Sequence, residues 1–455
     1  MSNDTRQFFG TDGIRGKANK YPLTADFVVR LGQAVAEVFL EGRGETHDWP
    51  SVVIGKDTRQ SGDMLESAIS AGLNSRGIDV RLAGVVPTPA VAMLVRETGA
   101  AFGVVISASH NPFGDNGIKF FGPDGYKLTD EMELEIERRV LSDPESEVEG
   151  AIGRTSDLEK ATERYVDFVR SSAGEDRELL RGLTIALDCA NGASFETSEA
   201  ILRSLGATVK SFHHHPNGIN INEDCGCTHA GVIEALVKET GADVGVSHDG
   251  DADRVLLCDE TGSVLDGDEL MAIAAISMIE AGTLNENTLV STVMSNAGLD
   301  EAVANAGGKV VRAGVGDRYV LEKMREHGYN LGGEQSGHFI FLDHNTTGDG
   351  IVSAVQLLKT MRESGKPLSE LRKVLTKFPQ AQRNVRVSSK PAMKDLSCAP
   401  KIDEINALLG DAGRTLLRYS GTEPLLRILI EGKDEAQINE WADQLVELIG
   451  DEIGA

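Results

Sequence analysis

The chain has 455 residues, of which 40% are hydrophobic, so it can bury several cores and we expect three or four domains. Its 71 acidic and 45 basic side chains give a formal charge of −26, which argues against an extended surface for nucleic acid or an anionic membrane, because phosphates would be repelled. The five cysteines are odd in number, the N-terminus lacks a signal-peptide pattern and no run approaches ~20 apolar residues, so we expect a cytoplasmic protein with reduced thiols and no membrane span.

Short apolar strands alternate with helices from residue 51 onwards, which predicts α/β layers with largely parallel sheets. The first such segment begins with a strand at 51–55, continues through helices that start at Gly62 and Thr88, and ends with a strand that leads into Ser107. A polar loop follows that last strand. Loops beyond the carboxyl ends of strands usually bind ligands in α/β sheets, so this loop is a candidate site.

The same order of strands and helices recurs twice after the charged, poorly periodic segment 142–160. Each repetition ends, like the first, in a polar loop that contains glycine, which gives two further candidate sites. The predicted strands are 183–190, 208–212 and 243–250 in the second segment and 288–295, 309–316 and 330–341 in the third.

From about Lys377 the order changes to several strands followed by one helix at 435–450, which predicts a smaller α+β domain. We therefore expect three similar mixed α/β domains and a C-terminal α+β domain. The expected boundaries are 1–158, 159–262, 263–376 and 377–455.

The second polar loop, HDGDADR at 248–254, carries three aspartates. In an extended loop Asp249, Asp251 and Asp253 would project to one side, where three carboxylates repel each other unless a cation lies among them. Oxygen-only ligands favour Mg²⁺, and three aspartates leave part of its shell for a water or a substrate-like oxygen. A solvated acidic turn remains an alternative.

Two other metal hypotheses are weaker. The aspartates share the spacing of an EF-hand out to Glu260, but Arg254 stands where the EF-hand turn requires glycine, and strands flank the loop. The segment CGCTH at 225–229 follows three histidines at 213–215. Cys-x-Cys lacks the paired spacing of a structural zinc site, so a loop with free thiols is the favoured interpretation there.

The first polar loop presents Ser109 and His110 at the end of a buried strand. A phosphorylated Ser109 would supply an anionic oxygen to the metal, which would offset charge on the phosphoryl group as it leaves. His110 would orient or protonate, and Lys119 is near enough in sequence to act as a base or a phosphate clamp. A turn-forming Ser-His-Asn-Pro cluster with a solvated lysine beyond it is the alternative.

Two further loops carry polar residues suited to a sugar phosphate. In an extended third loop, Glu334, Ser336 and His338 would point the same way, toward a ligand with several hydroxyls or an amine, although a polar β-turn fits equally. The turn at 418–427 combines hydroxyls, backbone N–H groups and arginines, which match a phosphate dianion unless the arginines are only surface charge. The residues of that turn are Arg418, Ser420, Gly421, Thr422 and Arg427.

Nine motifs, taken together, resemble the phosphoglucosamine mutases of the α-D-phosphohexomutase superfamily over essentially the full chain. In order they are FFGTDGIRG, GKDTRQSG, VPTPAV, SASHNPFGDNGIKFF, DGDADR, VGDRYV, GEQSGH, TTGDG and SGTEPLLR. The resemblance implies a heart-shaped molecule of four domains, each of which contributes one loop to a central cleft. It also implies that Ser109 must be phosphorylated for activity and that its phosphate and the three aspartates hold one Mg²⁺ per chain.

The resemblance also assigns the remaining site residues. Arg15, His110, Lys119 and Arg254 match residues near the phosphoryl group, residues 334–338 match the sugar loop, and residues 418–427 match the distal phosphate loop. In this interpretation Lys119 takes and returns a hydroxyl proton, which requires a pKa lowered by burial or neighbouring cations.

The implied reaction interconverts glucosamine 6-phosphate and glucosamine 1-phosphate through a 1,6-bisphosphate, and it feeds UDP-N-acetylglucosamine synthesis. A kinase or a sugar 1,6-bisphosphate would first load Ser109, and a homodimer is expected. Three alternatives remain: a phosphomannomutase or phosphoglucomutase, a non-catalytic sugar-phosphate sensor, and a hydrolase that releases phosphate.

Overall fold

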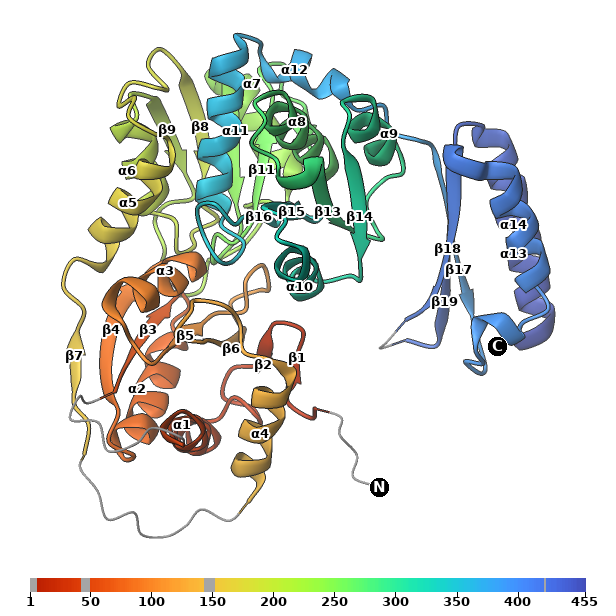
Figure 1. Cartoon of the computed structure of the whole chain (residues 1–455). Helices are drawn as coiled ribbons and strands as arrows, with labels where there is room; N and C mark the ends of the chain where they lie inside the picture. Colours follow the sequence, from red (N-terminus) through yellow and green to blue (C-terminus); the bar gives the residue numbers. More distant parts are fainter. Residues whose placement is uncertain (1–5, 42–49, 143–151, 421–422) are drawn as a thin grey trace. The chain divides into compact units, whose positions relative to one another are not determined.

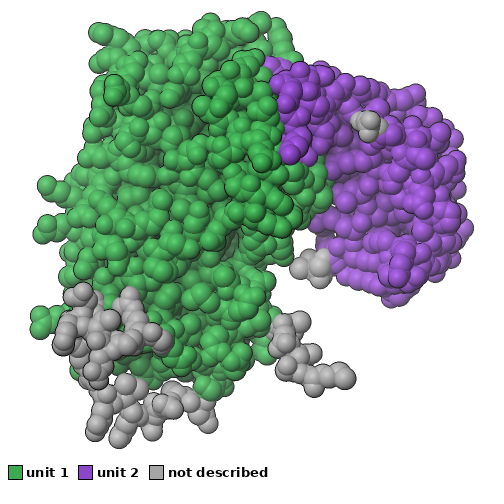
Figure 2. Space-filling view, in the orientation of Figure 1, with its two compact units in different colours: residues 1–293, 311–373 green, residues 294–310, 374–455 purple. Residues whose placement is uncertain are grey.

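The computed structural model describes residues 6–41, 50–142, 152–420 and 423–455 (Figure 1). Within them, four sheets of seven, five, four and three strands follow one another along the chain. The predicted organisation into three mixed α/β parts and a smaller C-terminal α+β part is therefore confirmed. The chain forms two compact units, residues 1–293 with 311–373 (unit 1) and residues 294–310 with 374–455 (unit 2) (Figure 2).

The first sheet is mixed, in the order β1-β2-β6-β5-β3-β4-β7. Strands β5, β3, β4 and β7 pair in parallel, but β6 returns antiparallel to β5, so the expectation of largely parallel sheets is only partly right. The hairpin of β5 and β6 places Lys119 opposite Val105. The strands are β1 (Phe9–Gly10), β2 (Gly13–Lys17), β3 (Ser51–Lys56), β4 (Asp79–Val85), β5 (Phe102–Ile106), β6 (Asp115–Phe121) and β7 (Thr155–Asp157).

Apolar side chains at helical spacing hold the first part together. Phe27, Leu31 and Val35, each four residues apart, lie buried on one face of α1. Helix α3 packs on β3 and β5 at two glycines, because a Cβ atom at Gly55 or Gly103 would lie 2.6 Å from a valine of α3. The helices are α1 (Ala25–Leu40), α2 (Gly62–Asn74), α3 (Thr88–Thr98) and α4 (Asp130–Leu141).

The second sheet has the order β12-β11-β10-β8-β9. Strands β9, β8 and β10 are parallel, and β11 returns antiparallel to β10. The strands are β8 (Thr184–Asp188), β9 (Thr208–Phe212), β10 (Val244–His248), β11 (Val255–Cys258) and β12 (Val264–Leu265), and the helices are α5 (Ala161–Ser172), α6 (Thr197–Ser204) and α7 (Ala230–Thr240).

The third sheet has the order β14-β13-β15-β16. The single strand expected at 330–341 is two antiparallel strands, because the chain turns between Gly333 and Phe339. The strands are β13 (Thr288–Thr292), β14 (Lys309–Ala313), β15 (Leu331–Gly333) and β16 (Phe339–Phe341), and the helices are α8 (Gly267–Glu280), α9 (Gly298–Asn305), α10 (Asp317–His327), α11 (Gly350–Ser364) and α12 (Leu368–Leu371).

One arrangement recurs in these three sheets. In each sheet a parallel strand is followed along the chain by an antiparallel partner, in the pairs β5–β6, β10–β11 and β15–β16. The three polar loops identified in the sequence are the turns of these hairpins. Each turn therefore lies at the carboxyl end of a buried strand and is anchored at both ends by a sheet.

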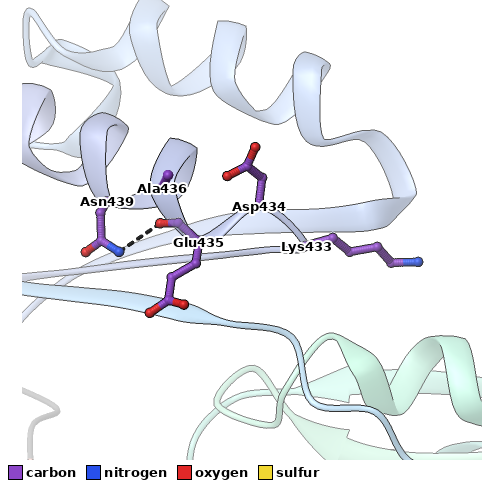
Figure 3. Close-up of a pocket in the computed structure, with 5 residues that line it drawn as sticks. All are labelled: Lys433, Asp434, Glu435, Ala436 and Asn439. Carbon is purple, nitrogen blue, oxygen red and sulfur yellow. Dashed lines mark hydrogen bonds between the residues drawn. The ribbon is translucent and has the colours of Figure 1, made fainter.

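Unit 2 carries an antiparallel sheet in the order β17-β19-β18, with Ile428, Ile430, Trp441 and Leu445 in its core. Its elements are β17 (Gln380–Arg386), β18 (Gly413–Tyr419), β19 (Leu425–Gly432), α13 (Ala399–Leu409) and α14 (Glu435–Ile453). Figure 3 shows a hollow at the start of α14, where the Asn439 side chain donates to the Glu435 carbonyl at 2.8 Å.

Short 3-10 helices complete the fold at Asn285–Asn287, Arg372–Val374, Met393–Asp395 and Gly410–Ala412. Among the described helices, none combines the length and the apolar character needed to cross a membrane.

Candidate active site

The three hairpin turns of unit 1 meet. The Ser109 hydroxyl donates to Oδ2 of Asp249 at 2.5 Å, which joins the first turn to the second. Arg254 forms a β-bridge with His338, and Nδ1 of that histidine lies 3.7 Å from Oδ1 of Asp253, which joins the second turn to the third. The fold thus brings together loops that lie more than 200 residues apart in the chain.

The three aspartates of the second turn form a site suited to a hard cation. Asp249, Asp251 and Asp253 are buried, and one oxygen atom from each lies within 4.8 Å of the others. Burial raises the pKa of Asp249 well above its usual value, and the two neighbouring carboxylates raise it further. Within the described residues, Oδ1 of Asp251 and Oδ1 of Asp253 are buried without a hydrogen-bond donor. This all-oxygen set fits Mg²⁺.

The aspartates converge for a reason that differs from the sequence prediction. The loop is a turn and not an extended segment, and Ala252 has a left-handed backbone with φ 56°. The Thr88 hydroxyl donates to Oδ2 of Asp251 at 2.6 Å, and the Arg254 amide donates to Oδ1 of Asp249 at 3.2 Å. The predicted cluster exists because a folded turn and its neighbours orient it.

Ser109 lies at the edge of this cluster in a left-handed conformation, with φ 52°. Its side-chain oxygen is 3.2 Å from Nδ1 of His110. Burial, together with the positive charges of Arg254 and Arg15, lowers the pKa of His110 to about 4. The imidazole is therefore uncharged at neutral pH and can accept a proton from a neighbouring hydroxyl.

Two guanidinium groups lie beside the serine turn. Arg15 belongs to β2 and lies opposite Gly117 of β6. Its guanidinium group pairs with Asp12, and its Nη1 atom lies 3.5 Å from the carbonyl oxygen of Ala108. The Nε atoms of Arg15 and Arg254 are buried and, among the described residues, have no acceptor. Buried N–H donors on positively charged groups are suited to bind an anionic phosphoryl group.

Lys119 differs from the sequence prediction in its charge. Its ammonium group lies 2.9 Å from both Asp12 and Asp251 and 3.7 Å from Asp253. Burial alone would lower the pKa of Lys119, but the three carboxylates outweigh burial and hold it above its usual value. The lowered lysine pKa expected for a general base is therefore wrong for this arrangement, and the side chain is a cation.

Charged side chains of alternating sign form a closed ring around this point. Three of its members, Asp12, Lys127 and Asp317, were not among the predicted site residues. Asp12 and Asp317 lie inside the motifs FFGTDGIRG and VGDRYV, so the motifs could have identified them as site residues. Nothing in the sequence distinguishes Lys127 in this way. The ring runs Lys119, Asp12, Lys127, Asp317, His338, Asp253 and back to Lys119, with separations of 2.9, 2.6, 2.5, 3.5, 3.7 and 3.7 Å.

The third turn also departs from the extended geometry expected for it. The Glu334 amide donates to the His338 carbonyl at 2.9 Å, and Gly337 adopts φ 90°, so the segment is a tight hairpin turn. Glu334 accepts from the Gly316 amide at 3.1 Å, while Ser336 is exposed at the tip. Strand-like alternation therefore does not make the side chains of Glu334, Ser336 and His338 point the same way.

His338 is the buried member of this turn. Burial lowers its pKa, but Asp253 and Asp317 outweigh that effect and raise the pKa to about 9, so the imidazole is positively charged at neutral pH. A Cβ atom at position 348 would lie 1.9 Å from Nε2 of His338, so the glycine of the TTGDG motif is what lets the imidazole fit.

The turn predicted to hold a distant phosphate belongs to unit 2, where it joins β18 to β19. Arg418 and Arg427 are directly opposite each other in this antiparallel pair, a placement of like charges that an anion would stabilise. Nη2 of Arg427 donates to Glu423 at 3.3 Å, and the Ser420 hydroxyl accepts from the Glu423 amide at 3.2 Å. The predicted residues Gly421 and Thr422 lie outside the described residues.

Comparison with known proteins places the whole chain in one family. The phosphoglucomutase/phosphomannomutase family matches residues 6–147 as alpha/beta/alpha domain I, 163–262 as domain II, 266–378 as domain III and 358–448 as the C-terminal domain. A phosphoglucosamine mutase from Geotalea daltonii is 51% identical over 453 residues, which are 99% of either chain. The chain belongs to the phosphoglucosamine mutase family.

Solved structures show that the fold of this phosphoglucosamine mutase family member is widely shared. A phosphoglucomutase/phosphomannomutase family protein from Burkholderia thailandensis superposes with a TM-score of 0.79 at 23% identity and covers 98% of this chain and 99% of its own. An N-acetylphosphoglucosamine mutase from Aspergillus fumigatus, in complex with GlcNAc-6P and magnesium, has a TM-score of 0.66 at 18% identity, with 99% and 96% covered. At these identities the likeness concerns the fold alone.

The histidine- and cysteine-rich loop of this phosphoglucosamine mutase family member, residues 213–229, has a hydrogen-bond network of its own. Asp188, His213 and Cys225 do lie together, but both oxygens of Asp188 accept backbone amides, from Ala190 at 2.9 Å and Gly226 at 2.8 Å. Burial raises the pKa of the Cys225 thiol to about 12, and all five cysteines are free and buried. The favoured interpretation of a loop with free thiols agrees with this geometry.

Proposed function

We propose that the protein is an isomerase that interconverts glucosamine 6-phosphate and glucosamine 1-phosphate and so feeds UDP-N-acetylglucosamine synthesis. Its relatives of about half identity over the full chain are named phosphoglucosamine mutases. The structural observation that carries the proposal is the contact between the Ser109 hydroxyl and Asp249 in a cluster of three buried carboxylates. An acceptor hydroxyl beside a cation site is the arrangement that phosphoryl transfer needs.

The proposed cycle uses Ser109 as the carrier of one phosphoryl group. The group leaves Oγ of Ser109 for O1 of glucosamine 6-phosphate, and the product is a 1,6-bisphosphate. The bisphosphate then reverses its orientation, and its 6-phosphoryl group passes to Oγ of Ser109. Glucosamine 1-phosphate departs, and the loaded serine is restored.

The residues around Ser109 receive distinct roles. Arg15, Arg254 and Lys119 would offset the negative charge of the transferring group, and the raised pKa of Lys119 supports the clamp rather than the base. His110, uncharged and 3.2 Å from Oγ, is assigned the proton transfer that accompanies each step. Acid–base assistance of this kind contributes about 10²- to 10⁴-fold.

The proposed cofactor is one Mg²⁺ per chain, held by Asp249, Asp251, Asp253 and the phosphate on Ser109. When bound, it supplies positive charge that stabilises the phosphoryl group in transfer. Two carboxylate oxygens of the cluster that lack a hydrogen-bond donor in the described part of the chain support this assignment.

The substrate would be bound at two places. Glu334, Ser336 and His338 are proposed to bind the hydroxyl and amino groups of the sugar. Arg418, Ser420, Gly421, Thr422 and Arg427 are proposed to bind the phosphate that is not reacting.

Several further expectations accompany this function as proposals. The domain boundaries are 1–158, 159–262, 263–376 and 377–455, and the four family matches support this division. We propose that a kinase or a sugar 1,6-bisphosphate loads Ser109, and that the enzyme acts in the cytoplasm as a homodimer.

The test combines intact mass and peptide mapping of the purified protein with an isomerisation assay on glucosamine 6-phosphate and Mg²⁺. We expect one phosphoryl group on Ser109, turnover of glucosamine 6-phosphate, and complete loss of turnover in Ser109→Ala. Near-normal turnover by that variant would refute the serine cycle.

Phosphomannomutase or phosphoglucomutase activity is the second candidate, because the matching family carries both names. Side-by-side kcat/KM values for glucosamine, glucose and mannose phosphates separate the two. Net phosphate release in the same assay would indicate a hydrolase, and binding without turnover would indicate a sensor.

A further inference from the structure

The backbone of the serine turn is held in an unusual way. Ser109 has φ 52°, a conformation that a residue with a side chain adopts at a cost and keeps only when its surroundings enforce it. Its amide donates to the Ser107 hydroxyl at 2.9 Å, and that hydroxyl donates to Asp57 at 2.5 Å. These two bonds fix the amide side of the turn.

The carbonyl side is fixed by two donors that each bridge the same pair of oxygens. Nδ2 of Asn222 donates to the carbonyl of Ser109 at 2.9 Å and to that of Asn111 at 3.0 Å. Nη2 of Arg59 donates to the same carbonyls at 3.2 and 2.5 Å. Arg59 is fully buried and paired with Asp57, so its guanidinium group cannot turn away to water.

Asn222 reaches the serine turn from a loop in the part of the chain that forms the second sheet. It lies between β9 and α7, and its backbone N–H group donates to the carbonyl of Ala190 at 2.9 Å. The same region contacts the first part of the chain at a second point, where the Thr58 hydroxyl donates to the carbonyl of Asn191 at 2.6 Å. The histidine- and cysteine-rich loop therefore buttresses the serine turn, a role that its composition did not suggest.

The aspartate turn closes over this bridge. A Cβ atom on Gly250 would lie 2.6 Å from the Ser109 carbonyl and 2.8 Å from Nδ2 of Asn222, so only glycine fits between Asp249 and Asp251. The Asn222 side chain thus binds the backbone of Ser109 and lies close to Gly250, the residue between Asp249 and Asp251.

We propose that Asn222 and Arg59 are positioning residues that hold Ser109 in its left-handed conformation, so that Oγ faces the three aspartates. The inference rests on the proposed function for its kinetic consequence, but its structural content does not. Neither side chain contacts the reacting oxygen. Each acts through the backbone of Ser109.

The kinetic test compares Asn222→Ala with Asn220→Ala, a control in the same loop whose amide donates only within that loop, to the His215 carbonyl. We expect Asn222→Ala to lower kcat roughly 10- to 100-fold with little change in KM, because a small misplacement of a reacting group has that effect. Asn222→Asp, which keeps the volume but loses the donor, should lose at least as much. Wild-type kcat in both Asn222 variants would overturn the proposal.

A second measurement needs no turnover. Ser109→Gly and Ser109→Ala both remove the hydroxyl, but only glycine is relaxed at φ 52°. If the bridge enforces this conformation, Ser109→Gly should melt at a higher temperature than Ser109→Ala, and the difference should shrink in the Asn222→Ala background. An equal difference in both backgrounds would overturn the proposal. A wild-type protein without phosphoserine or turnover would refute the proposed function, while this comparison would still decide on the bridge.

Discussion

The ammonium nitrogen of Lys119 lies 2.9 Å from Oδ2 of Asp251, and both side chains are buried. This pair joins the β5–β6 hairpin to the aspartate turn, and together with Asp12 and Asp253 the carboxylate of Asp251 keeps the lysine positively charged. A protonated lysine in this position can bind a phosphoryl group, but it cannot accept a proton while the carboxylates keep it protonated.

Substitution of Lys119 separates these two roles. Lys119→Arg keeps the positive charge and cannot act as a base, so a clamp predicts that much of kcat survives. Lys119→Met should lower kcat by about 10²-fold or more and destabilise the fold by about 3–5 kcal/mol, because buried carboxylates lose their partner. Steady-state kinetics and thermal melts measure both effects. A Lys119→Arg variant as inactive as Lys119→Met would instead favour the base.

Removal of the metal should be visible without an activity assay. Mg²⁺ should raise the melting temperature, because a ligand that binds only the folded state stabilises it by about 2.7 kcal/mol at 100 times its Kd. A chelator should reverse the shift, and Asp253→Asn should largely abolish it. Asp157→Asn, on the exposed edge strand β7, is the matched control and should respond like the wild type. An unchanged shift in Asp253→Asn would contradict the assignment of the three aspartates.

The facing arginines of unit 2 give a prediction about binding. Arg427→Ala should raise KM for the sugar phosphate roughly 10- to 100-fold, because a hydrogen bond to a charged group contributes about 1.5–3 kcal/mol. Arg383→Ala removes another arginine of the same sheet, one that pairs with Asp443, and should leave KM unchanged. Equal KM values in the two variants would place the distal phosphate elsewhere.

The histidine- and cysteine-rich loop gives a prediction about the pH dependence of stability. The hydrogen bond to Asp188 raises the pKa of His213 above its usual value, against the opposing effect of burial. The folded state therefore favours the protonated ring, so the pair stabilises below the unfolded pKa of about 6.5 and loses its effect as pH rises through the folded pKa.

The melting-temperature difference between the wild type and His213→Asn should accordingly be larger at about pH 6 than at about pH 9. Asparagine is chosen because it tolerates the left-handed backbone of position 213, φ 45°. His215→Asn, at an exposed position, is the control. A difference that grows with pH would refute the sign.

The sequence pattern selected residues that the structure brings together, but it did not describe their geometry. Asp249, Asp251 and Asp253 were expected together because of strand-like alternation, yet a turn with Ala252 at positive φ brings them together, and local pattern does not encode such a turn. Lys119 was found, but its charge depends on Asp12, which lies more than 100 residues away. The fold class followed from the alternation of strands and helices. The antiparallel return of β6 did not, because pairing partners depend on the folded chain.

The positioning role of Asn222 illustrates the same limit. An asparagine in a polar loop has no pattern that distinguishes it from Asn217 or Asn220. Its significance depends on two carbonyl groups contributed by a distant turn.

The ring of six alternating charges has as many positive as negative members once His338 is protonated, so this part of a strongly acidic protein is close to electroneutral. A divalent ion or a phosphoryl group entering alone would leave a buried excess of one sign, whereas the two together would largely cancel. Each should therefore increase the affinity for the other by the same factor, as thermodynamic linkage requires. The enzyme with phosphorylated Ser109 would then bind the ion more tightly than the enzyme with unmodified Ser109. With neither group present, the enzyme would bind each of them only weakly.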